Sequence, residues 1–222
     1  MTRCLLVGAA PSEGRGLRFV LDTLDFDVII AVDGGYGTLL DLGFVPDAAF
    51  GDFDSLGYTP DEGIVSAFDT HKDFTDMDWA LNYAFEHAFD DVVICDAFVG
   101  RLDHTLGNMQ LLVQAARRGQ KVWGVSDEEV IVALVGPGPF SRLSFDTGAR
   151  GTLSVLSHSD VASGVREEGL EYSLGDATVI NHVVWGVSNE LVASPAHISL
   201  EQGSLWVLFP LSELPRAHYG VF

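Results

Sequence analysis

Basic side chains are scarce in this chain of 222 residues. Lysine and arginine together number 12, against 32 aspartates and glutamates, so the formal net charge is −20 at pH 7. Such an acidic chain repels phosphodiester backbones and anionic lipids, which argues against nucleic acid or a membrane surface as a partner. An anionic small molecule would need a bound cation to lie near these carboxylates. The two lysines are Lys72 and Lys121, and Lys72 falls among the motifs described below.

Cysteines and long apolar runs are scarce as well. Cys4 and Cys95 each stand inside a short apolar segment, so we interpret them as buried hydrophobic side chains rather than a disulfide or redox pair. No apolar run approaches the ~20 residues that a membrane-spanning helix needs. The apolar segment that begins at Cys4 is too short for a secretory signal and soon meets Pro11. We therefore expect a cytoplasmic protein with no membrane contact.

Buried strands alternate with amphipathic helices in the first part of the chain. The pattern predicts strands over residues 3–9, 27–32, 48–50, 91–95, 121–125 and 130–134, and helices over 17–24, 36–42, 103–118 and from Thr75 onward. This alternation is typical of a mostly parallel, Rossmann-like α/β sheet with helices on both faces. Ligands of such sheets bind at the carboxyl ends of the strands.

The pattern changes at residues 135–139, where two prolines and two glycines in five residues indicate a boundary. Beyond this point we find no convincing helix. Short β-rich segments recur instead, at 140–145, 151–157, 178–184, 190–193, 196–200 and 204–209. Their spacing predicts a small antiparallel sandwich or barrel. We therefore predict an α/β domain over residues 1–136 and a β domain over residues 137–222.

The most informative short motif is the run Gly51-Asp52-Phe53-Asp54-Ser55. In an extended chain, Asp52 and Asp54 would point to the same face and Phe53 to the other. Two adjacent carboxylates repel unless a cation lies between them or one of them takes up a proton. Hard divalent ions, Mg²⁺ above all, suit such an oxygen pair. Taken alone, however, the run is more typical of a solvated turn.

Further motifs stand next to the predicted strands and helices: Asp33-Gly34-Gly35, Lys72 to Asp76, and Gly100 to His104. Because Asp33 and Asp52 each follow a strand, we expect these distant acids to converge on one rim of the sheet. Structural interpretations stay open beside the functional ones. Asp103 has the position of a helix N-cap, and the two glycines after Asp33 suit a tight turn.

Taken together, the motifs resemble the thiamin pyrophosphokinase family. They occur in the family's order and at about its spacing: Asp33-Gly34-Gly35, Pro46-Asp47, Gly51 to Ser55, Thr75-Asp76, Gly100 to His104, Gly169-Leu170 and Ser188 to Glu190. The resemblance implies a catalytic α/β domain that binds ATP and Mg²⁺, followed by a thiamin-binding β-sandwich. It also implies a homodimer with thiamin bound between the subunits. Departures include Val99, where many relatives have a second glycine, and Tyr172, where some have tryptophan.

The implied reaction converts ATP and thiamin into AMP and thiamin diphosphate. On this interpretation Asp52, Asp54 and Asp76 hold one or two Mg²⁺ ions, with Asp33 close by. Asp54 or Asp76 could instead orient or deprotonate the attacking hydroxyl, and the residues alone do not separate these roles.

The remaining candidates would bind the two substrates. We expect Lys72 and Arg101 to neutralise the triphosphate; the alternative is a surface ion pair with a nearby aspartate. Backbone groups at Thr75, Gly34 and Gly35, together with Asp103, would also contact the nucleotide. Thiamin is a cation with an aromatic ring, and the candidates to bind it are Tyr172, Ser188 and Asn189. We expect Trp185 and Trp206 to lie in the core of the β domain.

Other functions compete with this one. A related pyrophosphokinase could act on a pterin alcohol, and a sensor could bind thiamin or a nucleotide without catalysis. The full acidic set argues against the sensor, which could lose its metal ligands and still bind. A purely structural module would not explain acids placed at several strand ends.

Overall fold

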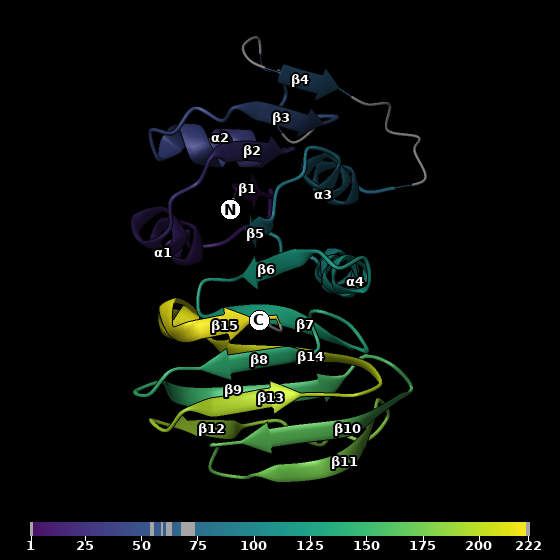
Figure 1. Cartoon of the computed structure of the whole chain (residues 1–222). Helices are drawn as coiled ribbons and strands as arrows, with labels where there is room; N and C mark the ends of the chain where they lie inside the picture. Colours follow the sequence, from purple (N-terminus) through teal and green to yellow (C-terminus); the bar gives the residue numbers. More distant parts are fainter. Residues whose placement is uncertain (1, 54–55, 59, 61–63, 68–73, 221–222) are drawn as a thin grey trace. The chain divides into compact units, whose positions relative to one another are not determined.

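The computed structural model describes residues 2–53, 56–58, 60, 64–67 and 74–220 (Figure 1). The chain forms two compact units: Met1–Leu111 with Val122–Asp127, and Leu112–Lys121 with Glu128–Phe222. The fold is mixed α/β, with a large mixed sheet and a second, antiparallel sheet. The predicted α/β class is therefore confirmed, while the finer Rossmann-like and sandwich description stays a prediction.

The first unit is built on parallel strands, in the order β6-β5-β1-β2-β3-β4. Their bounds are β1 Arg3–Val7, β2 Val28–Val32, β3 Ala48–Gly51, β4 Ile64–Ala67, β5 Asp91–Cys95 and β6 Lys121–Val125. The pairs β1–β2, β1–β5, β2–β3 and β3–β4 are all parallel. All five residues of β5 are buried, as expected for a strand covered on both faces. Cys4 and Cys95 are both free and buried, which confirms their interpretation.

The α-helices of the described residues are α1 Arg15–Thr23, α2 Gly35–Asp41, α3 Asp76–Glu86 and α4 Leu102–Arg117. All four match helices predicted from the sequence. Helix α3 begins as predicted, because the Thr75 side chain accepts a hydrogen bond of 3.2 Å from the backbone N–H of Asp78. Helix α3 packs against β1, β2 and β3, and α2 packs against β1 and β2. None of the helices in the described part of the chain has the length and apolar character that crossing a bilayer requires.

The second unit is antiparallel. Its strands are β7 Glu129–Gly136, β8 Arg142–Phe145, β9 Arg150–Ser157, β10 Val161–Glu168, β11 Leu174–Ile180, β12 Asn189–Val192, β13 Ala196–Ser199, β14 Gly203–Pro210 and β15 Ala217–Tyr219, and a 3₁₀ helix, η1, covers Leu211–Arg216. They form the orders β12-β9-β14-β7 and β11-β10-β13-β8-β15. Strand β7 precedes the predicted boundary at residue 137 but pairs along its whole length with β14. The division into domains 1–136 and 137–222 stays a prediction.

Candidate active site

A cavity of about 450 Å³ lies in the first unit, at the carboxyl ends of the parallel strands. Asp33, Asp52 and Asp96 line it, and each is the first residue after a strand: β2, β3 and β5, respectively. The loop after β1 and the start of α3 complete much of the wall. Parallel strands end at the same edge of a sheet, and this places residues far apart in sequence around one space.

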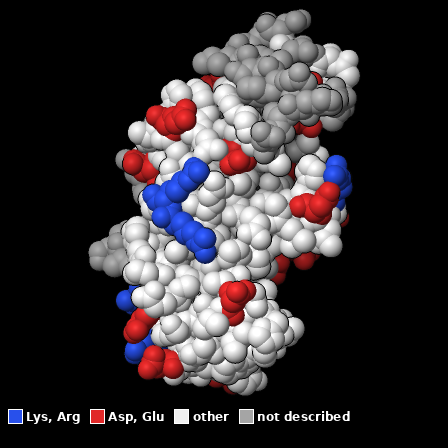
Figure 2. Space-filling view, turned by 90° about the vertical axis from the view of Figure 1, so that its right-hand side faces the viewer, with Lys and Arg blue, Asp and Glu red and all other residues white. Residues whose placement is uncertain are grey.

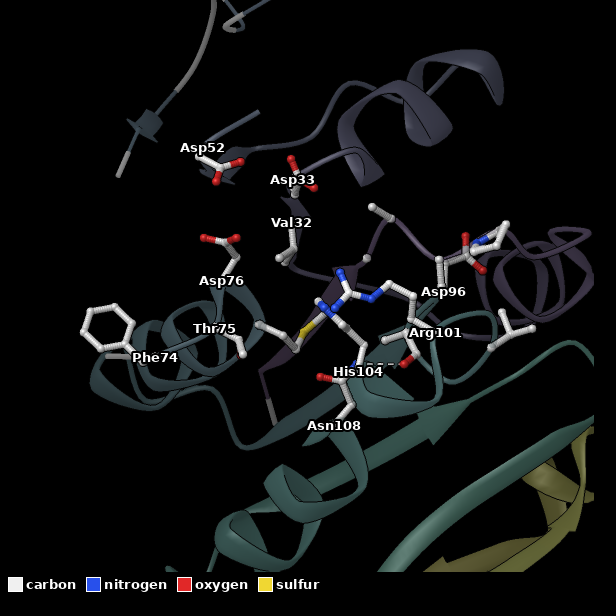
Figure 3. Close-up of a pocket in the computed structure, with 17 residues that line it drawn as sticks. Val32, Asp33, Asp52, Phe74, Thr75, Asp76, Asp96, Arg101, His104 and Asn108 are labelled. Atoms are coloured by element: carbon white, nitrogen blue, oxygen red, sulfur yellow. Dashed lines mark hydrogen bonds between the residues drawn. The ribbon is translucent and has the colours of Figure 1, made fainter. Parts of the chain in front are cut away.

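Most of the predicted acidic set meets in this cavity. Asp33, Asp52 and Asp76 all line it, and in the view of Figure 3 they lie on one side, with the carboxylates of Asp52 and Asp76 facing each other. Asp54, the third predicted metal ligand, lies outside the described residues. Within the described part of the chain, no three His, Cys, Asp or Glu side chains are grouped as a metal site. The predicted trio of Asp52, Asp54 and Asp76 therefore stays a prediction.

The chain does not continue as an extended strand through the Asp52 motif. Phe53 has a φ of 57°, in the left-handed region, and its side chain is buried. The expectation of an extended segment is therefore wrong at Phe53: the chain turns there, which buries the ring and leaves Asp52 at the cavity. Gly51 precedes the turn, and a Cβ at Gly51 would lie 2.9 Å from the Cα of Asp33. Glycine thus allows the end of β3 to pass close to Asp33.

Arg101 lines the cavity and also forms an ion pair. Its Nε and Nη2 atoms donate to the two carboxylate oxygens of Asp103, at 3.2 and 2.7 Å. The hydrogen bond from Arg101 lowers the pKa of Asp103. Helix α4 begins at Leu102, one residue earlier than predicted, so Asp103 lies in its first turn. The alternative interpretation of Asp103 as an N-cap is therefore wrong. Lys72 lies outside the described residues.

The start of α3 contributes Thr75 and Asp76 to the cavity wall. Gly34 and Gly35 are not among the lining residues. Gly35 is instead a packing residue: a Cβ at this position would lie 2.0 Å from the carbonyl oxygen of Val7 in β1. Glycine at this position lets the first turn of α2 pack directly on the central strand.

Gly35→Ala is expected to lower the free energy of unfolding by about 3 kcal/mol, because the added methyl group would collide with backbone that cannot move aside. Denaturant unfolding of the purified variant measures this. Gly107→Ala is the matched control: Gly107 lies inside α4 with open space around its Cβ position, so alanine should be neutral or slightly stabilising. Unfolding of Gly35→Ala at the wild-type midpoint would contradict the packing argument.

The sequence interpretation missed Asp96, which lines the cavity. Asp96 is buried, and the Ser12 hydroxyl donates a hydrogen bond of 2.6 Å to its Oδ1. Asn108 holds the same loop by donating to the carbonyl of Ala97 at 2.7 Å. The available signal was the one that singled out Asp33 and Asp52: an acid immediately after a buried strand.

A second cavity, of about 310 Å³, lies in the second unit and brings together Tyr172, Ser188 and Asn189. The Asn189 side chain fixes the cavity wall: it accepts from the N–H of Tyr172 and donates to the carbonyl of Tyr172 and to Glu167. Burial raises the pKa of Glu167, which also lines this cavity. All three predicted thiamin-contact residues therefore border one space.

The prediction that Trp185 and Trp206 lie in the core is wrong. Trp185 is 51% exposed, since it stands in the loop between β11 and β12, and it lines the second cavity. Trp206 is half-buried, and its ring packs edge-on against His158. Exposure of Trp185 leaves an aromatic face available to a ligand.

The chain is similar to several known proteins. The family model described as "Thiamin pyrophosphokinase, catalytic domain" matches residues 23–124. The thiamine pyrophosphokinase of Bacillus subtilis is 32% identical over 182 residues, which are 79% of this chain and 84% of that protein. The crystal structure of a thiamine pyrophosphokinase from B. subtilis has a TM-score of 0.80 at 27% identity, covering 94% of this chain and 99% of that one. The crystal structure of a thiamin pyrophosphokinase from Geobacillus thermodenitrificans has a TM-score of 0.78 at 27% identity, covering 93% of this chain and 96% of that one. This chain belongs to the thiamin pyrophosphokinase family.

Proposed function

We propose that this protein transfers the pyrophosphoryl group of ATP to the hydroxyl of thiamin, forming thiamin diphosphate and AMP, in the presence of Mg²⁺. Membership of the family supports thiamin diphosphokinase activity. The observation that carries the proposal is the cavity of the first unit, where Asp33, Asp52 and Asp76 meet Arg101 at the strand ends. Because this cavity holds charged groups of both signs, it suits a triphosphate with a cation better than a neutral ligand.

The reaction requires no protein nucleophile. The thiamin hydroxyl oxygen forms a bond to the β-phosphorus and gives up its proton to a base. The bond from that phosphorus to the oxygen shared with the α-phosphorus breaks, and AMP leaves with that oxygen. Negative charge on the phosphate oxygens has to be stabilised, and the reactants have to be aligned. Arg101 supplies a planar cation that can contact two phosphate oxygens, and Lys72 is proposed as a second cation. Backbone N–H groups at the start of α3, next to Thr75, can also donate to phosphate.

The carboxylates of the cavity fit a magnesium ion, because oxygen donors are its preferred ligands. We assign its binding to Asp52, Asp54 and Asp76, with Asp33 in support. Mg²⁺ in such enzymes commonly takes only one or two carboxylates and completes its shell with water and substrate phosphates. When bound, it would neutralise phosphate charge beside these acids. Asp54 or Asp76 is the proposed group that orients or deprotonates the thiamin hydroxyl.

The net negative charge of the protein is compatible with a cationic substrate. On the face shown in Figure 2, basic side chains gather in a few places, and acidic ones are scattered more widely. Thiamin would be attracted to such a protein, and the second cavity offers it Tyr172, Ser188, Asn189 and the exposed ring of Trp185. We further propose a homodimer in which thiamin binds between subunits. The cytoplasmic location expected from the sequence stays a prediction.

Direct product analysis tests the proposal. Purified protein incubated with ATP, thiamin and Mg²⁺ should form AMP and thiamin diphosphate in equal amounts. Excess chelator should abolish turnover, and added Mg²⁺ should restore it. Formation of ADP, or turnover of a pterin alcohol without turnover of thiamin, would overturn it. Binding of ATP and thiamin without any product would identify a sensor instead.

A further inference from the structure

The cavity of the first unit contains a fourth acid to which the proposed reaction gives no task. Asp96 lines the cavity directly after β5, and only 5% of its surface is exposed. In the view of Figure 3, Arg101 lies between Asp96 and the side occupied by Asp52 and Asp76. In this view the two acidic places lie on either side of the Arg101 guanidinium, so we take them to contact different parts of one ligand.

One oxygen of Asp96 is held and the other is not. The Ser12 hydroxyl donates to Oδ1 at 2.6 Å, whereas Oδ2 is shielded from solvent and has no hydrogen-bond partner in the described structure. Burial raises the pKa of this carboxyl, which shows that the ionised form is poorly solvated. Buried polar atoms nearly always have a partner, and an exception in a cavity wall points to a donor that arrives with the ligand once neighbouring atoms of the wall shift to admit it.

The backbone at Asp96 is also costly to maintain. Its φ is 52°, in the left-handed region that residues other than glycine rarely adopt. An aspartate held in a strained conformation, with an unpartnered buried oxygen, lowers the stability of the fold for two separate reasons. Strain of this kind typically persists at functional sites, where the side chain has a use.

The kind of ligand group that can pair with Asp96 Oδ2 follows from the chemistry of a carboxylate. An ionised carboxylate can only accept hydrogen bonds, so in its ionised form Asp96 cannot pair directly with phosphate oxygens. A nucleotide whose phosphates lie beside Arg101 still carries hydroxyl donors on its ribose. An acid at the carboxyl end of a parallel strand is a recurring acceptor for ribose hydroxyls in other α/β nucleotide sites.

We propose that Asp96 Oδ2 accepts a hydrogen bond from a ribose hydroxyl of the bound nucleotide, and that Asp96 thereby selects ribonucleotides. Ser12 is a positioning residue, since its hydrogen bond to Oδ1 leaves Oδ2 for the ligand. The inference rests on the proposed function, because it takes the cavity to be the ATP site. It adds a residue that determines the choice of nucleotide.

Equilibrium binding in the presence of Mg²⁺ and without thiamin tests this inference. The probes are ATP and dideoxy-ATP, which lacks both ribose hydroxyls. The wild-type protein should prefer ATP by about 10-fold to 100-fold, the range for a hydrogen bond to a charged group. Asp96→Gly, which accepts the left-handed backbone, should bind both nucleotides equally. Asp96→Asn, which preserves shape, should show an intermediate preference.

A matched control separates the backbone from the side chain. Asp176 has a φ of 50° but is exposed in β11 of the second unit, so Asp176→Gly makes the same exchange away from the cavity. It should leave the preference for ATP unchanged. Thermal unfolding should show Asp96→Gly to be at least as stable as wild type, since a buried charge and a strained φ are both removed. If Asp96→Gly fails to fold, the Asp96→Asn ratio decides.

Other outcomes would overturn the inference. If Asp96→Gly and Asp96→Asn kept the wild-type preference for ATP, the inference would be overturned. It would also be overturned if Asp96→Gly lost affinity for ATP and for inorganic tripolyphosphate to the same extent. Discrimination against inosine triphosphate that disappears in Asp96→Gly would place Asp96 at the base instead. Failure of wild-type protein to bind ATP would overturn the inference too, whereas ATP binding without thiamin turnover would overturn only the proposed function.

Discussion

Asp52→Asn is expected to lower kcat by about 1,000-fold, the scale on which loss of one preorganised electrostatic contact to the transition state is felt. Asparagine has nearly the same size and keeps one oxygen, but it carries no charge. A neutral side chain would hold Mg²⁺ weakly and would no longer balance the cations around the triphosphate. The substitution removes charge from the side of the cavity where Asp52 and Asp76 face each other.

The fold should survive this change. Asp52 is half-buried at the carboxyl end of β3 and is not part of the apolar core. Neighbours such as Phe50 and Phe53 form that core. We expect an unchanged circular dichroism spectrum and a melting temperature close to that of wild type. Steady-state assays at several Mg²⁺ concentrations measure the effect. If Asp52 binds metal, very high Mg²⁺ should restore part of the activity.

Asp41→Asn is the matched control. Asp41 is an exposed acid at the last residue of α2, and it does not line the cavity. Removing its charge should leave kcat unchanged, because it is the position of the carboxylate that matters and not the total charge. Activity of Asp52→Asn near that of Asp41→Asn would eliminate the role assigned to Asp52.

Most elements of the first unit, though not β4, were predictable because local pattern and tertiary environment agree there. A strand buried on both faces is apolar throughout, as β5 shows, and an amphipathic helix such as α3 carries its own start signal at Thr75. The meeting of Asp33 and Asp52 followed from the rule that parallel strands end at one edge. These features depend on short stretches of chain.

Features set by distant partners were not predictable in this way. The hydrogen bond between Ser12 and Asp96 joins residues 84 positions apart, and no local pattern announces it. The left-handed turn at Phe53 accompanies burial of its ring, and the neighbouring residues do not prescribe that turn. Trp185 has a large apolar side chain of the kind expected in a core, but it stands in an exposed loop. Strand β10 was missed because Gly164 and its charged end obscure the alternation, and its pairing with β11 shifts register.

Arg101→Ala is expected to lower kcat/KM for ATP by about 100-fold, because the planar cation that we propose to contact the phosphates is lost. Arg101→Lys should recover only part of this, since lysine keeps the charge but not the fork that binds two oxygens at once. The effect should appear mainly with ATP as the varied substrate. A change confined to the KM for thiamin would place Arg101 elsewhere in the reaction.

The ion pair with Asp103 supplies the competing explanation and also the means to test it. If Arg101 serves only that pair, then removing either partner should have the same small effect, because exposed pairs contribute little. If Arg101 binds phosphate, Asp103→Asn should be far milder than Arg101→Ala, since it leaves the guanidinium in place. Arg166→Ala is the control: Arg166 pairs with Glu201 at 3.5 Å on the surface of the second unit, and its loss should change neither activity nor melting temperature. Equal activities in Arg101→Ala and Arg166→Ala would show that the guanidinium at the cavity never meets the nucleotide.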